Sequence, residues 1–349
     1  MNPPIPPVII RRLVIAPAVL LLGVVSLMTV PLLLITATLI SFWIPGKWRP
    51  LRLLGFALVY LAIECVGLLV CFLLWVLSGF GWKVRSPRFV EAHYRLMQGC
   101  LTVLYAAGTR LFKVRVVTDG VDIPAYDDDP TTIERPLIVM SRHAGPGDSF
   151  LIAHEIMSWT GRRPRIVVKD SMQLDPLIDV LLSRIPAEFV TPSDPSAGTL
   201  PAIERLATGM ATADALLIFP EGGNFTEQRR TRAIEKLRAA GHLEQAAKAE
   251  RLTNVLPPRP KGLFAALDGC PDADVVVVGH TGLDRLNSLR DVWRELPMDK
   301  TILLRWRRIP PSLVPTVFDL RVAWLYDLWA EIDDWIEDQQ DQLPSSDAH

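Results

Sequence analysis

Two long apolar segments dominate the first part of the chain. Residues 13–44 form a run of 32 residues without a charged side chain, and residues 53–82 form a run of 30 residues interrupted only by Glu64. As straight helices they would be roughly 48 and 45 Å long at about 1.5 Å per residue, whereas the hydrocarbon core of a bilayer is about 30 Å thick. Both are too long for simple upright spans, so a tilted helix, a broken helix or a re-entrant hairpin each fit.

Basic residues flank both apolar segments. The junctions carry Arg11 and Arg12, then Lys47, Arg49 and Arg52, and then Lys83, Arg85 and Arg88. The positive-inside bias would keep all three junctions cytoplasmic, which favours two re-entrant elements over one spanning hairpin. Pro17 and Pro31 offer places where the first segment could kink or break. A cleaved signal peptide is the alternative for the first segment, but its apolar region spans only about 7–15 residues.

The rest of the chain alternates between short apolar runs and helical patterns. The apolar runs cover residues 136–141, 165–170, 215–222 and 273–281, and residues 113–123 alternate like a further strand. Runs without polar alternation are typical of strands buried on both faces of a parallel sheet. The pattern predicts an α/β fold, a mostly parallel sheet flanked by helices. We expect membrane-embedded N-terminal elements over residues 1–84 and a cytoplasmic-face α/β domain over residues 85–349.

Three helical segments are predicted around these strands. Residues 89–112 fit one helix or two short ones, and residues 227–252 form a charged helical stretch that resembles an insertion. Its apolar side carries Ile234, Leu237 and Leu243. Near the C-terminus, spacings of three and four define one face of a helix, formed by Val322, Leu325, Trp329, Ile332 and Ile336. We expect this amphipathic helix to pack on the domain, with a partner or membrane surface as the alternative.

Charge and cysteine content narrow the class of protein. The 37 basic and 38 acidic residues nearly balance, so no global field indicates a nucleic-acid partner. The four cysteines have neither zinc-site nor disulfide-framework spacing, which fits a reducing compartment and predicts no metal. The chain has no GxSxG elbow, P-loop or GxGxxG, which argues against common hydrolases, kinases and dehydrogenases.

The segment SRHAGPGDSF sets His143 five positions ahead of Asp148. On a continuous helix these side chains would point about 140° apart, but Gly145, Pro146 and Gly147 predict a tight turn instead. The turn follows a buried strand and precedes a helix, where α/β folds place their sites. Asp148 could then accept a hydrogen bond from one imidazole nitrogen and leave the other free as a base. The alternative is an ordinary turn in which Asp148 only caps the helix.

A second strand-end segment is IFPEGG. Pro220 fixes the turn, and Glu221 follows at the end of the strand beside Gly222 and Gly223, which allow a ligand to approach the backbone. A solvated glutamate at a strand end is the alternative. His280 ends another predicted strand without a matching partner beside it, so we interpret it as structural or as part of the site wall.

Together these motifs resemble the glycerolipid acyltransferase family, which includes 1-acylglycerol-3-phosphate O-acyltransferase. His143 and Asp148 match the HxxxxD motif, which in that family supplies the catalytic dyad. The FPEG motif, which helps to bind the acceptor, is matched by Phe219, Pro220, Glu221 and Gly222, with Gly223 following. The resemblance covers roughly residues 85–335.

Further segments extend the resemblance, and others depart from it. VVKDSMQLDP places Lys169 and Pro176 at matching positions, and LPPRPKG supplies Arg259 and Lys261, so the resemblance implies substrate-binding roles for Lys169, Arg259 and Lys261. Thr191 stands where the family usually has an arginine, and Gly223 and Asn224 replace a Thr-Arg pair often used for phosphate. Other arginines could substitute as phosphate anchors, although the cluster at residues 229–232 fits a solvated helix face or a contact with anionic lipid better. These candidates are Arg184, Arg229, Arg230 and Arg232.

The resemblance implies an integral membrane O-acyltransferase with its catalytic domain on the cytoplasmic face. It would move a fatty acyl chain from acyl-CoA, a co-substrate rather than a bound cofactor, to the free hydroxyl of a lysophospholipid. The expected acceptor is 1-acylglycerol-3-phosphate and the product phosphatidic acid. A transacylase or an enzyme for another lysolipid, a thioesterase, and an inactive lipid-binding homologue are the alternatives. Membrane lipids are expected partners, and the sequence predicts no particular oligomeric state.

Overall fold

The short apolar runs form the centre of a seven-stranded sheet with the order β1-β7-β6-β2-β5-β3-β4. The computed structural model describes residues 5–119, 135–145, 147–191, 198–284, 286 and 288–342. The strands are β1 (Val114–Asp119), β2 (Leu137–Ser141), β3 (Arg163–Lys169), β4 (Ala187–Val190), β5 (Asp214–Ile218), β6 (Asp274–Thr281) and β7 (Lys300–Ile309). All neighbours are parallel except β6 and β7, which are antiparallel. The predicted α/β class with a mostly parallel sheet is confirmed.

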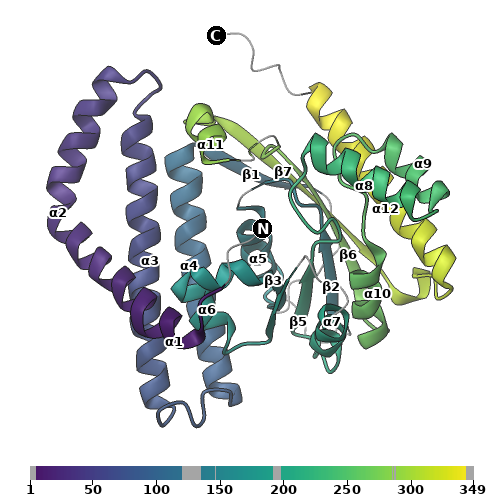
Figure 1. Cartoon of the computed structure of the whole chain (residues 1–349), viewed down its shortest axis with the longest axis horizontal. Coiled ribbons are helices and arrows are strands. Elements are labelled where there is room, and N and C mark those ends of the chain that lie inside the picture. Colours follow the sequence, from purple (N-terminus) through teal and green to yellow (C-terminus); the bar gives the residue numbers. More distant parts are fainter. Residues whose placement is uncertain are drawn as a thin grey trace.

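Helices cover both faces of this sheet, which explains the unbroken apolar runs (Figure 1). In β2, Leu137 and Val139 contribute to the core on one face, whereas Ile138 and Met140 contribute to the core on the other. The helices on the first face are α4 (Pro87–Phe112), α5 (Asp148–Ser158) and α6 (Pro176–Leu182). The helices on the second face are α7 (Thr199–Ala207), α8 (Glu227–Ala239), α9 (Leu243–Arg251), α10 (Pro260–Gly269) and α12 (Phe318–Gln342). The short helix α11 (Leu289–Glu295) precedes β7.

Two of the predicted helical segments differ in detail from the structure. The charged stretch after β5 is divided into α8 and α9, and Leu243, expected on its apolar side, is 68% exposed. The division comes at Gly241, whose φ of +78° ends the helical path. The segment at residues 89–112 is one helix, α4. In α12 the predicted apolar face is buried on the domain, with Leu325 and Trp329 fully covered.

The two long apolar segments form an antiparallel pair of helices beside α4 (Figure 1). The first comprises α1 (Val8–Ile10), a π-helical turn (Arg11–Ile15) and α2 (Ala16–Trp43), and the second is α3 (Arg49–Leu77). Both are long and apolar enough to cross a membrane, which by itself is weak evidence that they do. Pro31 lies inside α2 without ending it. Neither segment turns back on itself, and the choice between a re-entrant and a spanning arrangement stays a prediction.

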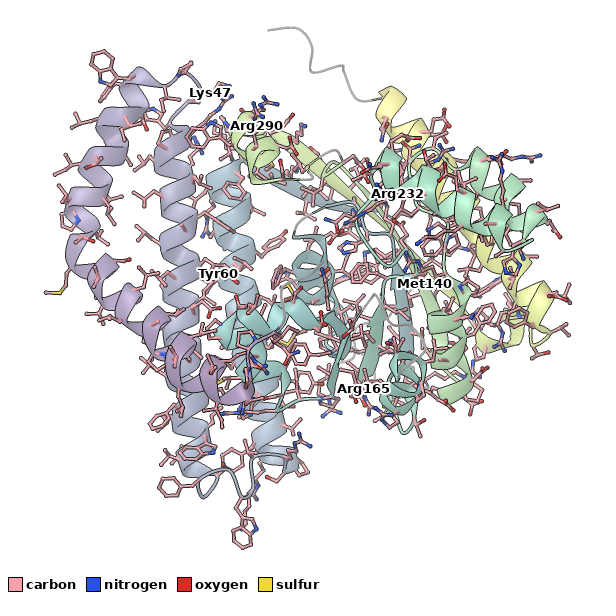
Figure 2. All side chains as sticks on the ribbon, in the orientation of Figure 1. Lys47, Tyr60, Met140, Arg165, Arg232 and Arg290 are labelled. Atoms are coloured by element: carbon pink, nitrogen blue, oxygen red, sulfur yellow. The ribbon has the colours of Figure 1, made fainter. Side chains whose placement is uncertain are left out.

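Both ends of this helix pair are bonded to the α/β domain. At the turn between α2 and α3, Lys47 lies 3.3 Å from the Asp299 carboxylate (Figure 2). At the opposite end Arg11, which is buried, lies 2.9 Å from Asp179 of α6. Near the C-terminal end of α3, the carbonyl oxygen of Cys71 accepts a hydrogen bond from the Arg184 side chain at 2.6 Å. Because all these partners belong to one domain, α3 lies along the domain rather than extending away from it.

Candidate active site

Parallel pairing brings the two strand-end segments together at one edge of the sheet. Met140 of β2 lies opposite Ile218 of β5, so the segments that follow leave the same edge. The backbone N–H of Phe225 donates to the carbonyl of His143 at 2.8 Å and ties the two segments directly. The ring centroids of His143 and Phe219 lie 4.8 Å apart. The structure therefore assembles the HxxxxD and FPEG segments into one site.

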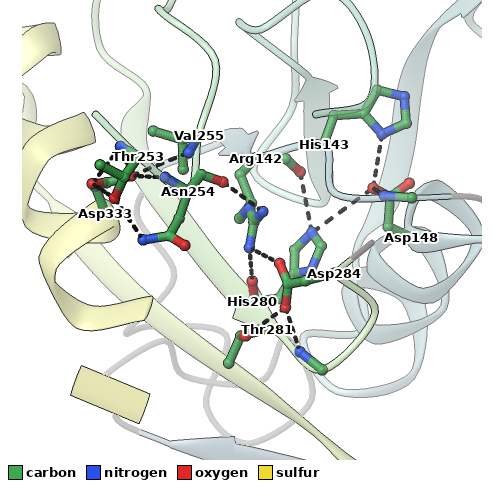
Figure 3. A network of polar contacts seen from close by, with 12 residues as sticks. Arg142, His143, Asp148, Thr253, Asn254, Val255, His280, Thr281, Asp284 and Asp333 are labelled. Atoms are coloured by element: carbon green, nitrogen blue, oxygen red, sulfur yellow. Dashed lines mark hydrogen bonds and ion pairs between the residues drawn. The ribbon is translucent and has the colours of Figure 1, made fainter. Parts of the chain in front are cut away.

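His143 and Asp148 form a hydrogen-bonded pair. Nδ1 of His143 lies 2.7 Å from Oδ2 of Asp148 (Figure 3). Gly147, with φ +96°, precedes α5 as its N-terminal cap, and Asp148 is the first residue of the helix. The turn at Gly145 is close-packed, because an added Cβ would lie 3.0 Å from the Leu286 carbonyl oxygen. Pro146, the middle residue of the predicted turn, lies outside the described residues.

The environment of Asp148 keeps its carboxylate charged. Burial of this fully covered side chain raises its pKa, but the hydrogen bond and charge of His143, together with His280 and the backbone N–H of Gly145, outweigh burial and hold the pKa below its ordinary value. The N–H of Ser149 donates to its Oδ1 at 2.6 Å. A charged Asp148 accepts only, so Nδ1 of His143 carries the proton and Nε2 has a free lone pair.

The second nitrogen of His143 remains accessible. The side chain is 22% exposed, against 1% for Asp148. Nε2 points away from the carboxylate (Figure 3), and none of the residues that the structure describes hydrogen-bonds to it. A base whose tautomer is fixed on one side and whose lone pair is open on the other can accept a proton from a bound hydroxyl.

Glu221 occupies a different place from the one the sequence suggests. The side chain is 1% exposed, and its Oε1 accepts a hydrogen bond from Nε1 of Trp329 in α12 at 3.4 Å. Burial raises its pKa to about 8, only partly offset by the charge of Arg142 and by nearby N–H donors. The acceptor-binding role of the FPEG segment stays a prediction, and the Glu221 side chain itself is buried against α12.

Glu221 makes the stability of the protein depend on pH. The unfolded chain loses this proton near pH 4.5, whereas the folded chain keeps it until about pH 8. Unfolding therefore releases a proton between these values, and the free energy of unfolding falls as pH rises, by up to about 1.4 kcal/mol per pH unit. We expect Glu221→Gln to flatten this dependence, as measured by urea unfolding from pH 5 to pH 8. An unchanged slope in the variant would show that Glu221 is charged in the folded protein.

The glycines of the FPEGG segment lie beside two arginines. Gly222 has φ +69°, and a Cβ added to it would lie 2.8 Å from Nη1 of Arg259. A Cβ added to Gly223 would lie 3.1 Å from Nη1 of Arg229, the third residue of α8. Arg259 is also held by its own backbone N–H, which donates to the carbonyl of Pro220 at 2.8 Å. Two exposed guanidinium groups thus flank a stretch of backbone without side chains, an arrangement suited to a phosphate.

The other predicted candidates are two exposed lysines and an arginine that is bonded elsewhere. Lys169 is exposed at the end of β3, and Lys261 is exposed in the first turn of α10. Neither forms an ion pair with another described residue. Arg184, considered as a phosphate anchor, is bonded to Cys71 and to His93 instead. The structure therefore brings Arg229 and Arg259 to the FPEGG segment and leaves Arg184 away from it.

A buried arginine that the sequence does not single out lies directly behind the dyad. Arg142 is 1% exposed, and its guanidinium lies 2.6 Å from the carboxylate of Asp284 (Figure 3). It also donates to the carbonyls of His280 and Asn254 at 2.7 and 2.8 Å. The Asn254 segment is held in turn by the carboxylate of Asp333 in α12, which accepts from the N–H of Asn254 at 2.6 Å. Arg142 therefore links the loop after β6 and the segment before α10 to the segment between β2 and α5, which carries His143.

His280 is a neutral part of this network. It is fully buried, and burial, reinforced by the charge of Arg142, lowers its pKa to about 4. Its Nε2 lies 3.2 Å from the carbonyl oxygen of Arg142 and 3.9 Å from Asp148. This placement fits the structural or wall role predicted for it. Across the described parts of the chain, no group of three or more His, Cys, Asp and Glu side chains is arranged to hold a metal ion.

The fold and the dyad define an α/β domain equipped for general-base group transfer. A comparison with protein-family models matches residues 116–278, a range that includes both strand-end segments, to the family described as Acyltransferase. These residues therefore belong to the glycerolipid acyltransferase family, which supports acyl transfer in general as the chemistry of the domain. Searches of curated proteins and of solved structures gave no match.

Proposed function

We propose that the protein transfers a fatty acyl chain from acyl-CoA to the hydroxyl of 1-acylglycerol-3-phosphate and forms phosphatidic acid. The observation that carries the proposal is the dyad, with the proton on Nδ1 fixed by Asp148 and Nε2 open toward solvent. An intact dyad favours an active enzyme over an inactive lipid-binding homologue. The FPEGG segment with Arg229 and Arg259 supports an acceptor that carries a phosphate.

The proposed reaction needs no covalent enzyme intermediate. Nε2 of His143 takes the proton of the acceptor hydroxyl while that oxygen attacks the thioester carbonyl, and the charged Asp148 stabilises the imidazolium. Free N–H groups in the first turn of α5 stabilise the developing oxyanion. The C–S bond then breaks as the ester forms, and the leaving thiolate takes the proton from His143. The products are the ester and free CoA thiol.

The two long apolar helices support a membrane-attached enzyme, and the basic residues that flank them favour a site on the cytoplasmic face. The outer surface of α2 exposes large apolar side chains along its length, including Leu27, Met28 and Trp43 at 75%, 79% and 88% exposure. Such a surface is unfavourable in water and stable in lipid, where the acceptor and the donor's acyl chain also partition. Fractionation of cells into membrane and soluble parts, with alkaline washing, tests this attachment.

The decisive experiment measures thiol release from long-chain acyl-CoA by detergent-purified protein with a panel of lysophospholipids and glycerol phosphate. We expect release that depends on 1-acylglycerol-3-phosphate. Release without an acceptor would identify a thioesterase. Release with another lysolipid would reassign the acceptor, and none with any acceptor would contradict acyl-CoA as the donor.

Arg259 provides a test of the acceptor. We expect Arg259→Ala to raise the KM for 1-acylglycerol-3-phosphate by about tenfold or more, because a guanidinium bonded to phosphate is worth about 1.5–3 kcal/mol. The KM for acyl-CoA should change little. Arg251→Ala, which removes an exposed arginine at the end of α9, is the matched control. Equal acceptor KM values in both variants would remove Arg259 from the site.

A further inference from the structure

Helix α8 begins at the active site and runs away from it. Its N-terminal cap is Thr226, whose side chain accepts from the N–H of Arg229. The preceding residue, Phe225, donates its N–H to the carbonyl of the catalytic candidate His143. The start of α8 is therefore fixed relative to the dyad, so a row of side chains along this helix leads outward from the reacting atoms.

One side of α8 carries exposed basic residues, which we call the α8 cationic stripe: Arg229, Arg232 and Lys236. Their spacings of three and four residues place them on the same side of the helix. From Arg229, beside Gly223, the stripe extends for seven residues, or about 10 Å. It begins where the proposed acceptor phosphate binds and ends well beyond it.

The stripe differs from three other basic residues of α8 and α9, which have acidic partners. Arg230 pairs with Glu227, Arg238 with Glu250, and Lys248 with Asp327. Arg232 and Lys236 form no ion pair with any residue in the described ranges, although Glu235 is adjacent on the helix. Because the chain as a whole carries a net charge of −1, this row is a local feature rather than part of a general basic surface.

The position of the stripe distinguishes between two anionic ligands. Ile234 of α8 belongs to the core on the second face of the sheet, whereas Leu68 of α3 belongs to the core on the first. Figure 2 accordingly shows Arg232 on the opposite side of the molecule from Tyr60 of α3. A bilayer in contact with α2 would therefore lie against the other face, so an anionic lipid surface is not the ligand that this placement favours.

A soluble polyanion that reaches the dyad fits the stripe better. The proposed donor has this shape, since the thioester that reacts at His143 is joined by a long uncharged arm to a nucleotide with several phosphates. We propose that Arg232 and Lys236 bind the phosphates of the CoA moiety, whereas Arg229 and Arg259 serve the acceptor. This assignment rests on acyl-CoA being the donor, as proposed above.

The test compares two donors in the double variant Arg232→Ala/Lys236→Ala. With acyl-CoA, we expect the KM for the donor to rise about tenfold and the acceptor KM to stay within about twofold of the wild-type value. With the same acyl chain on N-acetylcysteamine, which lacks phosphates, wild type and variant should have equal kcat/KM. The control Arg238→Ala/Lys248→Ala removes the same charge from paired residues and should leave the donor KM unchanged.

Each other outcome would overturn the assignment. An unchanged KM for acyl-CoA, or an equal loss with the phosphate-free thioester, would remove the stripe from donor binding. Loss of binding to vesicles containing phosphatidylglycerol, with an unchanged donor KM, would assign it to a lipid surface. If wild-type protein fails to use acyl-CoA with any acceptor, the proposed function itself is wrong. If wild-type protein turns over normally and the double variant has the same donor KM, only the proposed binding of CoA phosphates by the stripe is wrong.

Discussion

Replacing His143 with alanine is expected to abolish acyl transfer while leaving the fold intact. The imidazole combines a free lone pair, a fixed tautomer and exposure to solvent, and general-base catalysis contributes about 10²–10⁴-fold to a rate. Because the side chain is partly exposed and bonded only to Asp148, its removal leaves the core unchanged. Thiol release under saturating acceptor measures the loss, and urea unfolding verifies the fold.

Two further variants make this expectation specific to the dyad. Asp148→Asn keeps the volume of the side chain but can present an N–H to Nδ1, which favours the wrong tautomer, so a comparable loss of kcat is expected. His242→Ala removes an exposed histidine before α9 and should retain wild-type activity. Normal turnover by His143→Ala would refute the mechanism, because no other described histidine combines exposure with a buried carboxylate partner at this edge of the sheet.

The largest expected effect on stability comes from Arg142. Burial raises the pKa of Asp284, but the charge of Arg142 and the hydrogen bonds from Thr281 and Gly282 outweigh burial and lower it to about 2, so the carboxylate is charged. Replacing Arg142 with methionine leaves this buried charge without its main partner. Removing one member of a buried ion pair costs about 3–5 kcal/mol. The carbonyls of His280 and Asn254 would also lose their donor. We expect a loss of this size in urea unfolding at pH 7.

An exposed ion pair and a double variant serve as controls for the stability loss expected of Arg142→Met. Arg307→Met removes an arginine whose pairing with Glu331 is exposed, and should cost less than about 1 kcal/mol. The double variant Arg142→Met/Asp284→Asn should lose less than the sum of its single variants, because the two groups interact directly. A loss below about 1 kcal/mol for Arg142→Met would mean that the pair is not buried in solution.

The sequence predicts the central strands well because β2, β5 and β6 are covered on both faces and are therefore apolar throughout. It does not predict β7 or β4. In β7 the exposed Arg305 and Arg307 alternate with buried Leu304 and Trp306, so the strand lacks an unbroken apolar run. β4 has only four residues at the edge of the sheet. Such strands form largely because neighbouring strands pair with them, and the local pattern of apolar and polar residues does not show this pairing.

The candidate site likewise contains residues that the sequence predicts and residues that it does not. His143 and Asp148 are five residues apart, so the turn between them already predicts that they meet. Arg142 is adjacent in sequence but was not predicted, because arginine is usually a surface residue and its partner Asp284 is 142 positions away. Burial of Glu221 depends on Trp329 in α12, 108 positions away. The signal that could have identified Arg142 is a charged residue directly after a strand that is apolar on both faces.

The attachment of the helix pair at both ends bears on how substrates arrive. Lys47 and Arg11 lie at opposite ends of α2 and its preceding turns, yet both bond to the same domain. While these contacts hold, the two ends cannot lie on opposite sides of a bilayer, so an attached enzyme would occupy a single leaflet. The proposed lysophospholipid acceptor would then arrive by lateral diffusion in two dimensions. Initial velocity would follow the mole fraction of acceptor in the bilayer, and adding inert phospholipid at constant total acceptor would slow the reaction by surface dilution.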